Sequence, residues 1–220
     1  MELQIHTASA AEQMVEQQVR AWDVLDQRVL DVMRRVPREL FVPAAQRYRA
    51  YADVEVPLAR EQHMLRPSVV GRLLQAVLPQ DAEQVLEIGA GSGFVTACLR
   101  SMAQQVRAVE IFPELADAAR RNLVAFGLRD VEITDGDVLQ EDGGAHYDVI
   151  AITASLPLYD ARFERRLKLG GRLFVVIGEP PVMEARLIRR SGENAFATQS
   201  LFETVIDPLV NAPRPPLFSF

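Results

Sequence analysis

Residues 85–94 read Val-Leu-Glu-Ile-Gly-Ala-Gly-Ser-Gly-Phe, and this stretch decides the fold. An apolar run ends at Ile88, three glycines follow at alternate positions, and a helix is expected to begin near Phe94. Gly89 permits a tight turn, and Gly91 lets a ligand approach the backbone because it has no Cβ. The N–H groups of such a turn and the positive end of the helix dipole can hold polar or anionic ligand groups. A glycine turn alone also fits a plain strand-to-helix connection.

Apolar runs like the one before the glycines recur through the middle of the chain and alternate with helical stretches such as residues 113–126. Runs rich in β-branched residues are typical of strands buried on both faces, and strand–helix alternation is typical of parallel sheets. We therefore predict an α/β fold with a doubly wound, mostly parallel sheet. The expected strands cover residues 84–88, 106–110, 131–134, 149–153 and 172–177.

The sequence pattern divides the chain into three regions. Residues 1–80 are expected to form an N-terminal cap of helices and loop, because the amphipathic spacing stops before Pro37 and prolines recur up to Pro67. Residues 81–178 hold the core of alternating strands and helices. Residues 179–220 carry two more strand candidates and an extended proline-rich tail, which we expect to complete the same domain.

Composition excludes several classes of protein. The 220 residues suffice for one substantial domain, and with 49% hydrophobic and 25% charged residues the chain is not mainly disordered. Its net charge of −6 disfavours nucleic acid as a partner. A single Cys98 and three histidines supply neither a disulfide nor a structural zinc site, so we expect no metal. No apolar run spans a membrane, and the first residues lack the order of a signal peptide, so we expect a cytoplasmic protein.

A second strand ends in Glu110, 21 positions after Gly89 (110 − 89 = 21), and Ile111 follows it. An acid at this place can accept hydrogen bonds from both hydroxyls of a ribose. After the third strand, Asp137 can accept from an adenine amino group while Val138 packs on the ring. A plain turn would also explain the acidic residues there. Together the three motifs indicate a nucleoside-binding site.

Two details favour S-adenosylmethionine over NAD as the nucleoside cofactor. The glycine spacing is not the G-x-G-x-x-G of dinucleotide sites, because Phe94 stands where the last glycine would be. Glu87, just before the turn, would repel a pyrophosphate but suits an ammonium or sulfonium group. The residues predicted to bind the cofactor are Glu87, Gly89, Ala90, Gly91, Ser92, Gly93, Glu110, Ile111, Asp137, Val138 and Thr153.

These motifs resemble those of the Rossmann-like S-adenosylmethionine-dependent methyltransferases, and more specifically the protein-L-isoaspartate O-methyltransferase family. Residues 36–43, Val-Pro-Arg-Glu-Leu-Phe-Val-Pro, are similar to that family's VPRE-x-FVP signature, and residues 51–53 to its AY-x-D element. The resemblance continues through residues 86–93, 147–150 and 169–173. It implies a seven-stranded sheet completed by the tail, and methyl transfer from S-adenosylmethionine to an isoaspartyl carboxylate in a protein or peptide.

The resemblance fails in one segment, where the family carries Thr-Ile-Ser-x-Pro beside the methyl donor. Here residues 63–67 read His-Met-Leu-Arg-Pro, so that Leu65 stands in place of the family serine. A leucine side chain can neither donate nor accept a hydrogen bond. His63 and Arg66 are therefore the candidate catalytic residues: His63 as a base for an amine or hydroxyl acceptor, Arg66 as a cation that attracts a substrate carboxylate.

Other functions remain open from the sequence. A carboxylate acceptor, with a pKa of about 4, needs no base, so that catalysis would come from alignment and desolvation. With Leu65, the alternatives are a related methyltransferase with a different acceptor, including a small molecule, or a protein that binds S-adenosylmethionine without catalysis. A nicotinamide oxidoreductase is disfavoured by the glycine spacing and by Glu87.

Overall fold

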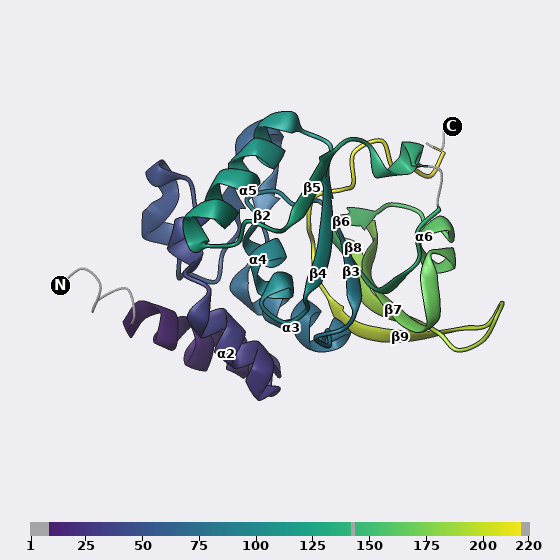
Figure 1. The fold of residues 1–220 in the computed structure, drawn as a ribbon, viewed down its shortest axis with the longest axis horizontal. Coiled ribbons are helices and arrows are strands. Elements are labelled where there is room, and N and C mark those ends of the chain that lie inside the picture. The colour runs from purple at the N-terminus through teal and green to yellow at the C-terminus, as the bar shows by residue number, and fades with distance from the viewer. Residues whose placement is uncertain (1–8, 142–143, 217–220) are drawn as a thin grey trace.

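The computed structural model describes residues 9–141 and 144–216. A seven-stranded sheet runs through the middle of the molecule, and the N-terminal helices lie at the opposite end from the β8–β9 hairpin (Figure 1). The first residues, on which the expectation about a signal peptide rested, lie outside the described residues. Within these ranges, no helix is long and apolar enough to cross a membrane.

The sheet has the strand order β5-β4-β3-β6-β7-β8-β9, and it confirms the predicted doubly wound, mostly parallel, Rossmann-like architecture. Strands β5 to β7 are parallel, whereas β8 is antiparallel to both of its neighbours. The tail supplies the last strands, as the resemblance implied. The strands are β3 (Gln84–Ile88), β4 (Gln105–Glu110), β5 (Glu132–Asp135), β6 (Tyr147–Leu156), β7 (Leu167–Glu179), β8 (Val182–Arg190) and β9 (Phe196–Glu203).

Strand β6 is longer than the sequence indicated. It was expected to end at Thr153, but it continues to Leu156 because Ser155 and Leu156 pair with Val176 and Ile177 of β7. Ser155 also bridges Pro208 of the C-terminal segment. Thr153 therefore lies within the strand and does not follow it.

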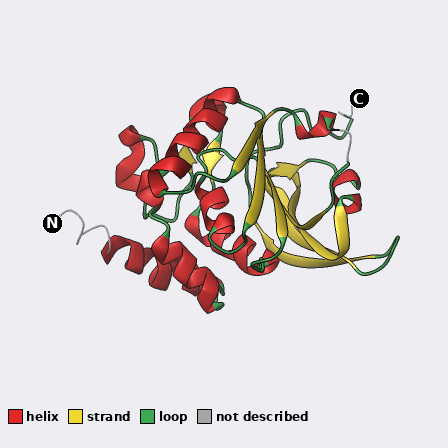
Figure 2. Cartoon of the chain, in the orientation of Figure 1, coloured by secondary structure: helices red, strands yellow, loops and turns green. Residues whose placement is uncertain are grey.

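Alternate residues of the central strands face two separate cores, which is why these strands read as continuous apolar runs. Val85 and Val149 face one core, and Leu86 and Ile150 face the other; all four are buried. Most of the helices gather on the first face, whereas the short α6 and the C-terminal segment cover the second (Figure 2). The helices are α2 (Gln27–Arg35), α3 (Pro67–Val77), α4 (Phe94–Arg100), α5 (Pro113–Phe126) and α6 (Arg162–Arg165).

The proline-rich stretch between α2 and α3 is ordered by short turns and a small hairpin. Strand β1 (Val56–Pro57) pairs antiparallel with β2 (His63–Met64), and this hairpin carries the divergent segment to the sheet edge. The turns are η3 (Arg38–Leu40), η4 (Ala44–Arg49) and η5 (Ala59–Glu61). Before α2, residues 9–14 are helical and continue into η1 (Val15–Val19) and η2 (Arg20–Trp22); η6 (Val138–Gln140) follows β5.

Arg172 on β7 joins three elements at the other end of the sheet. Its guanidinium donates to both oxygens of Glu83, at 2.7 and 2.8 Å, and to the carbonyl oxygens of Val77 and Leu78 at the end of α3. The side chain is only 9% exposed. Burial alone would raise the pKa of Glu83, but hydrogen bonds, chiefly from Arg172, hold it below its ordinary value.

We expect Arg172→Leu to lower the free energy of unfolding by about 3 kcal/mol, because it removes the buried cation that donates to the Glu83 carboxylate and to two carbonyls. Urea unfolding at neutral pH measures the loss. Arg189→Leu, on the exposed side of β8, is the matched control and should change stability by less than about 0.5 kcal/mol. Equal effects of the two substitutions would contradict a structural role for the Arg172 contacts.

Candidate cofactor and methyl-transfer site

The parallel register brings the predicted site residues to one edge of the sheet. Ile88 pairs with Val109 on one side and with Ile152 on the other. The glycine turn after β3, Glu110 at the end of β4 and Thr153 inside β6 therefore lie next to one another at this edge. Two adjoining cavities open at this edge, and Gly89 lines both.

The glycine turn requires glycine for packing as well as for its backbone. Gly89, Gly91 and Gly93 all have positive φ, at 93°, 54° and 85°. A Cβ at Gly89 would lie 2.6 Å from the Thr153 hydroxyl, which donates to the Gly89 carbonyl at 2.6 Å. A Cβ at Gly93 would lie 3.2 Å from the backbone of Ala119 on α5. The turn is thus held close to both β6 and α5.

Glu110 is fixed by the backbone of the turn that it faces. One carboxylate oxygen accepts from the Gly91 N–H at 2.8 Å, and the other accepts from the Phe112 N–H at 3.0 Å. Burial raises the pKa of Glu110 above its ordinary value, although these backbone donors oppose the shift. Each oxygen keeps a further lone pair for a ligand hydroxyl.

Glu87 is fully buried in β3, between Ala108 and Ala151 of the neighbouring strands. Neither of its carboxylate oxygens has a hydrogen-bond partner among the described residues. Burial raises the pKa of Glu87 to about 8; the Thr96 hydroxyl opposes the shift, and the charge of Glu110 adds to it. A buried carboxylate without a partner is costly, and a cationic ligand group in the adjoining cavity would offset that cost.

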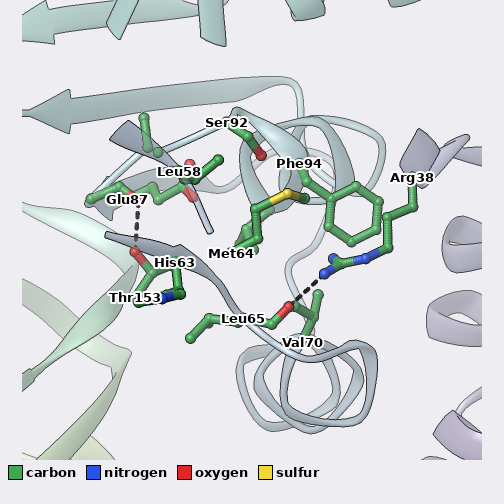
Figure 3. Close-up of a pocket in the computed structure, with 14 residues that line it drawn as sticks. Arg38, Leu58, His63, Met64, Leu65, Val70, Glu87, Ser92, Phe94 and Thr153 are labelled. Atoms are coloured by element: carbon green, nitrogen blue, oxygen red, sulfur yellow. Dashed lines mark hydrogen bonds between the residues drawn. The ribbon is translucent and has the colours of Figure 1, made fainter. Parts of the chain in front are cut away.

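The first cavity joins the glycine turn to the divergent segment, with His63, Met64 and Leu65 on its wall (Figure 3). The Nδ1 atom of His63 lies 2.9 Å from Asp207 Oδ2. Leu65 is buried and lines the cavity. The structure thus brings His63 to the site, together with a carboxylate that the sequence did not single out.

Arg66, the other catalytic candidate, is not among the residues that line the two cavities. Its guanidinium donates to the Thr204 hydroxyl at 3.3 Å and lies 5.8 Å from the centre of the Trp22 ring. Trp22 itself is 37% exposed.

Arg38 is a cavity residue that the sequence marked only as part of a signature. It is fully buried, lies 4.8 Å from the centre of the Phe94 ring, and donates from Nη2 to the Leu65 carbonyl at 2.8 Å (Figure 3). Its Nε and Nη1 atoms have no partner among the described residues, and burial lowers the pKa of the guanidinium to about 10. This hydrogen bond fixes the backbone of the divergent segment.

The C-terminal segment forms part of the second cavity, a role that the sequence did not indicate. Pro208, Leu209 and Val210 face Ile111 and Val138 across it. The segment is tied to β6, because Leu209 N donates to Ser155 O at 2.8 Å. Its contacts join residues about fifty positions apart, so that no local pattern in the sequence could have indicated them.

Asp137 borders the second cavity, but each of its carboxylate oxygens already accepts a hydrogen bond from the protein. One carboxylate oxygen accepts from the Leu139 N–H at 2.9 Å, and the other accepts from the Asn211 side chain at 3.0 Å. Among the described residues, no group of three or more His, Cys, Asp or Glu side chains is placed to hold a metal ion.

The structure combines a parallel sheet, a Glu-x-Gly-x-Gly-x-Gly turn, an acid at the end of the second strand and a buried, unpaired carboxylate. Together these features define a Rossmann-like methyltransferase. Comparison with known proteins agrees. The family model for protein-L-isoaspartate(D-aspartate) O-methyltransferase matches residues 9–213. The chain belongs to this family, whose members are S-adenosylmethionine-dependent methyltransferases. The predicted family, enzyme class and methyl donor are thereby confirmed.

Relatives agree with this assignment, and a solved structure shares the fold. Protein-L-isoaspartate O-methyltransferase of Rhodopseudomonas palustris is 40% identical over 201 residues, which cover 90% of this chain and 92% of the relative. The Aeropyrum pernix protein of the same name is 38% identical over 202 residues, 90% of this chain and 78% of that one. A putative family member from Plasmodium falciparum, solved with S-adenosyl-L-homocysteine, shares the fold with a TM-score of 0.80 at 17% identity, covering 90% and 97% of the two chains.

Glu87→Gln tests the burial of this carboxyl group. Folding raises the pKa of Glu87 from 4.5 to about 8, so that the folded protein binds the proton more tightly than the unfolded chain does. The proton on Glu87 therefore stabilises the folded state fully below pH 4.5. This contribution to the free energy of unfolding is lost as the pH rises through about 8, by at most ~1.4 kcal/mol per pH unit. We expect ligand-free E87Q to lack this part of the decline.

Urea unfolding of wild type and variant across this pH range measures the difference. Glu203→Gln, at an exposed position of β9, is the matched control and should keep the wild-type pH dependence. The same pH slope in E87Q and wild type would contradict a raised pKa at Glu87.

Proposed function

We propose that this enzyme transfers a methyl group from S-adenosylmethionine to the carboxylate of isoaspartyl residues in proteins or peptides. The observation that carries the proposal is the buried, unpaired Glu87 carboxylate on the wall of a cavity that also reaches residues 63–65. A cationic methyl donor fits such a carboxylate, and the acceptor would enter from the side of the hairpin. The relatives' shared name supplies the isoaspartyl substrate.

Different residues of the two cavities would bind different parts of the cofactor. Glu87 and the turn from Gly89 to Gly93, with Ala90 and Ser92, would hold the amino-acid end. Glu110 would accept from the ribose hydroxyls, since its oxygens are already oriented by the backbone. Ile111, Asp137 and Val138 would surround the adenine, and Thr153 would act by fixing Gly89.

The chain's own residues act on the reaction by position and by excluding water. S-adenosylmethionine, when bound, supplies an electrophilic methyl group on a sulfonium. An ionised carboxylate acceptor needs no proton removed, so the site needs no base for it. Apolar walls from Leu58, Met64 and Leu65 remove water from around the acceptor, and the glycine turn and hairpin fix its approach.

A different acceptor is the second candidate, because one observation favours it. Leu65 is buried against the cavity, so that its wall presents an apolar side chain where the family resemblance places a hydroxyl. An enzyme of this class acting on another carboxylate, an amine or a hydroxyl would keep the same cofactor residues.

Methyl transfer from labelled S-adenosylmethionine to an isoaspartyl peptide, compared with its normal aspartyl twin, tests the proposal. We expect transfer to the isoaspartyl peptide and only background with the twin. No transfer to either peptide, with cofactor binding intact by calorimetry, would contradict isoaspartyl specificity and favour the second candidate.

Glu110→Ala tests the cofactor assignment independently of the acceptor. We expect the Kd for S-adenosylmethionine to rise about tenfold or more, because two hydrogen bonds to a carboxylate are lost and the Gly91 N–H is left without an acceptor. Calorimetric titration measures this Kd. Glu132→Ala, at an exposed position, is the control and should leave the affinity unchanged. Unchanged affinity in E110A would show that the ribose lies elsewhere.

A further inference from the structure

His63 and Asp207 form a pair that joins two distant parts of the chain at the cavity. His63 belongs to the β1–β2 hairpin, and Asp207 lies in the C-terminal segment after β9. The Asp207 carbonyl accepts from Ser155 N at 2.8 Å, so that the backbone carrying this carboxylate is tied to β6. A carboxylate only accepts, so the His63 Nδ1–H donates to Asp207 and Nε2 is the ring nitrogen left for a ligand.

Acidic groups from three parts of the chain line the space around this ring. Glu55, just before β1, Glu110 of β4 and Asp207 line a third cavity, which shares His63, Leu65 and Gly89 with the first. Burial and the charge of Asp207 raise the pKa of Glu55, and the nearby cations His63 and Arg66 act in the opposite direction. Without a positive charge beside it, this surrounding negative charge would repel an anionic acceptor.

The residues that follow His63 in the divergent segment offer no free side-chain donor to a carboxylate. Met64 and Leu65 have no side-chain donor, and the Arg66 guanidinium is directed to Thr204 and Trp22. His63 is therefore the donor that this segment offers to the cavity, where its side chain is 35% exposed.

Building on the proposed function, we propose that protonated His63, held by Asp207, donates a hydrogen bond from Nε2 to the substrate carboxylate and orients it for methylation. Asp207 is the positioning residue of this pair: it fixes the ring and stabilises its positive charge. The group recognised is a carboxylate, which accepts from Nε2 through one oxygen and leaves the other oxygen free to attack the methyl group.

The pH dependence of methyl transfer at saturating S-adenosylmethionine tests this assignment. For wild type we expect kcat/KM on an isoaspartyl peptide to fall as His63 loses its proton, within the range of about pH 5 to 8 where histidines titrate. His63→Gln keeps a neutral N–H donor, so its profile should be flat in that range. Below the break, the variant's KM for the peptide should be about 10- to 100-fold higher, since the charge-assisted hydrogen bond is lost.

Asp207→Asn is the matched variant, because an amide oxygen still accepts from Nδ1 but carries no charge. We expect it to retain a pH break and to move that break to lower pH, since the ring loses a stabilising carboxylate. The Kd for S-adenosylmethionine should change less than about twofold in both variants. A purely structural role for the pair would lower the rate without changing the shape of either profile.

The outcomes separate this inference from the proposed function. If wild type methylates the isoaspartyl peptide and H63Q keeps the wild-type pH profile, the role of His63 is wrong while the proposed function stands. If the wild-type rate instead rises through the histidine range and this rise is lost in H63Q, the ring acts as a base and the donor role is overturned. If wild type binds S-adenosylmethionine but does not methylate the peptide, both proposals fail.

Discussion

The site depends on the parallel register of β3 with β4 and β6. Because all three strands run in the same direction, the turn after Ile88, the acid that ends β4 and Thr153 of β6 arrive at one edge. The hydrogen bond from Gly91 N to Glu110 then links two strand ends through the ligand-facing turn itself. A shift of one residue in the β3–β4 pairing would turn Glu110 to the other face of the sheet and separate it from the turn.

Local sequence patterns were enough to predict this edge, because each of its parts lies within a few residues of a strand end. The period of the apolar runs indicated the sheet, and the α5 bounds agree with the predicted helix at residues 113–126. The glycine spacing identified a turn whose three positive φ angles the structure shows. Where packing across the sheet decides the structure, the same reasoning was less accurate: β6 extends past Thr153 because β7 and the C-terminal segment pair with it.

The acceptor side could not be predicted in this way, since it is assembled from segments far apart in the chain. Arg38 reaches the Leu65 carbonyl across 27 positions, and Asp207 reaches His63 across 144. An aspartate in a proline-rich tail carries no local signal of such a contact.

Buried charge distinguishes the two halves of the site. On the side where we propose that the cofactor binds, Glu87 is buried without a hydrogen-bond partner among the described residues, so that a cation in the cavity would offset the desolvation of its ionised form. On the acceptor side Arg38 is buried with a single hydrogen bond and an aromatic ring, and it acts through the backbone of Leu65. In the view of Figure 3 the two groups lie on opposite sides of Met64 and Phe94, and neither Glu87 oxygen has a hydrogen-bond partner among the described residues. A direct ion pair between them would stabilise the empty protein, whereas their separation leaves Glu87 available to a cationic ligand.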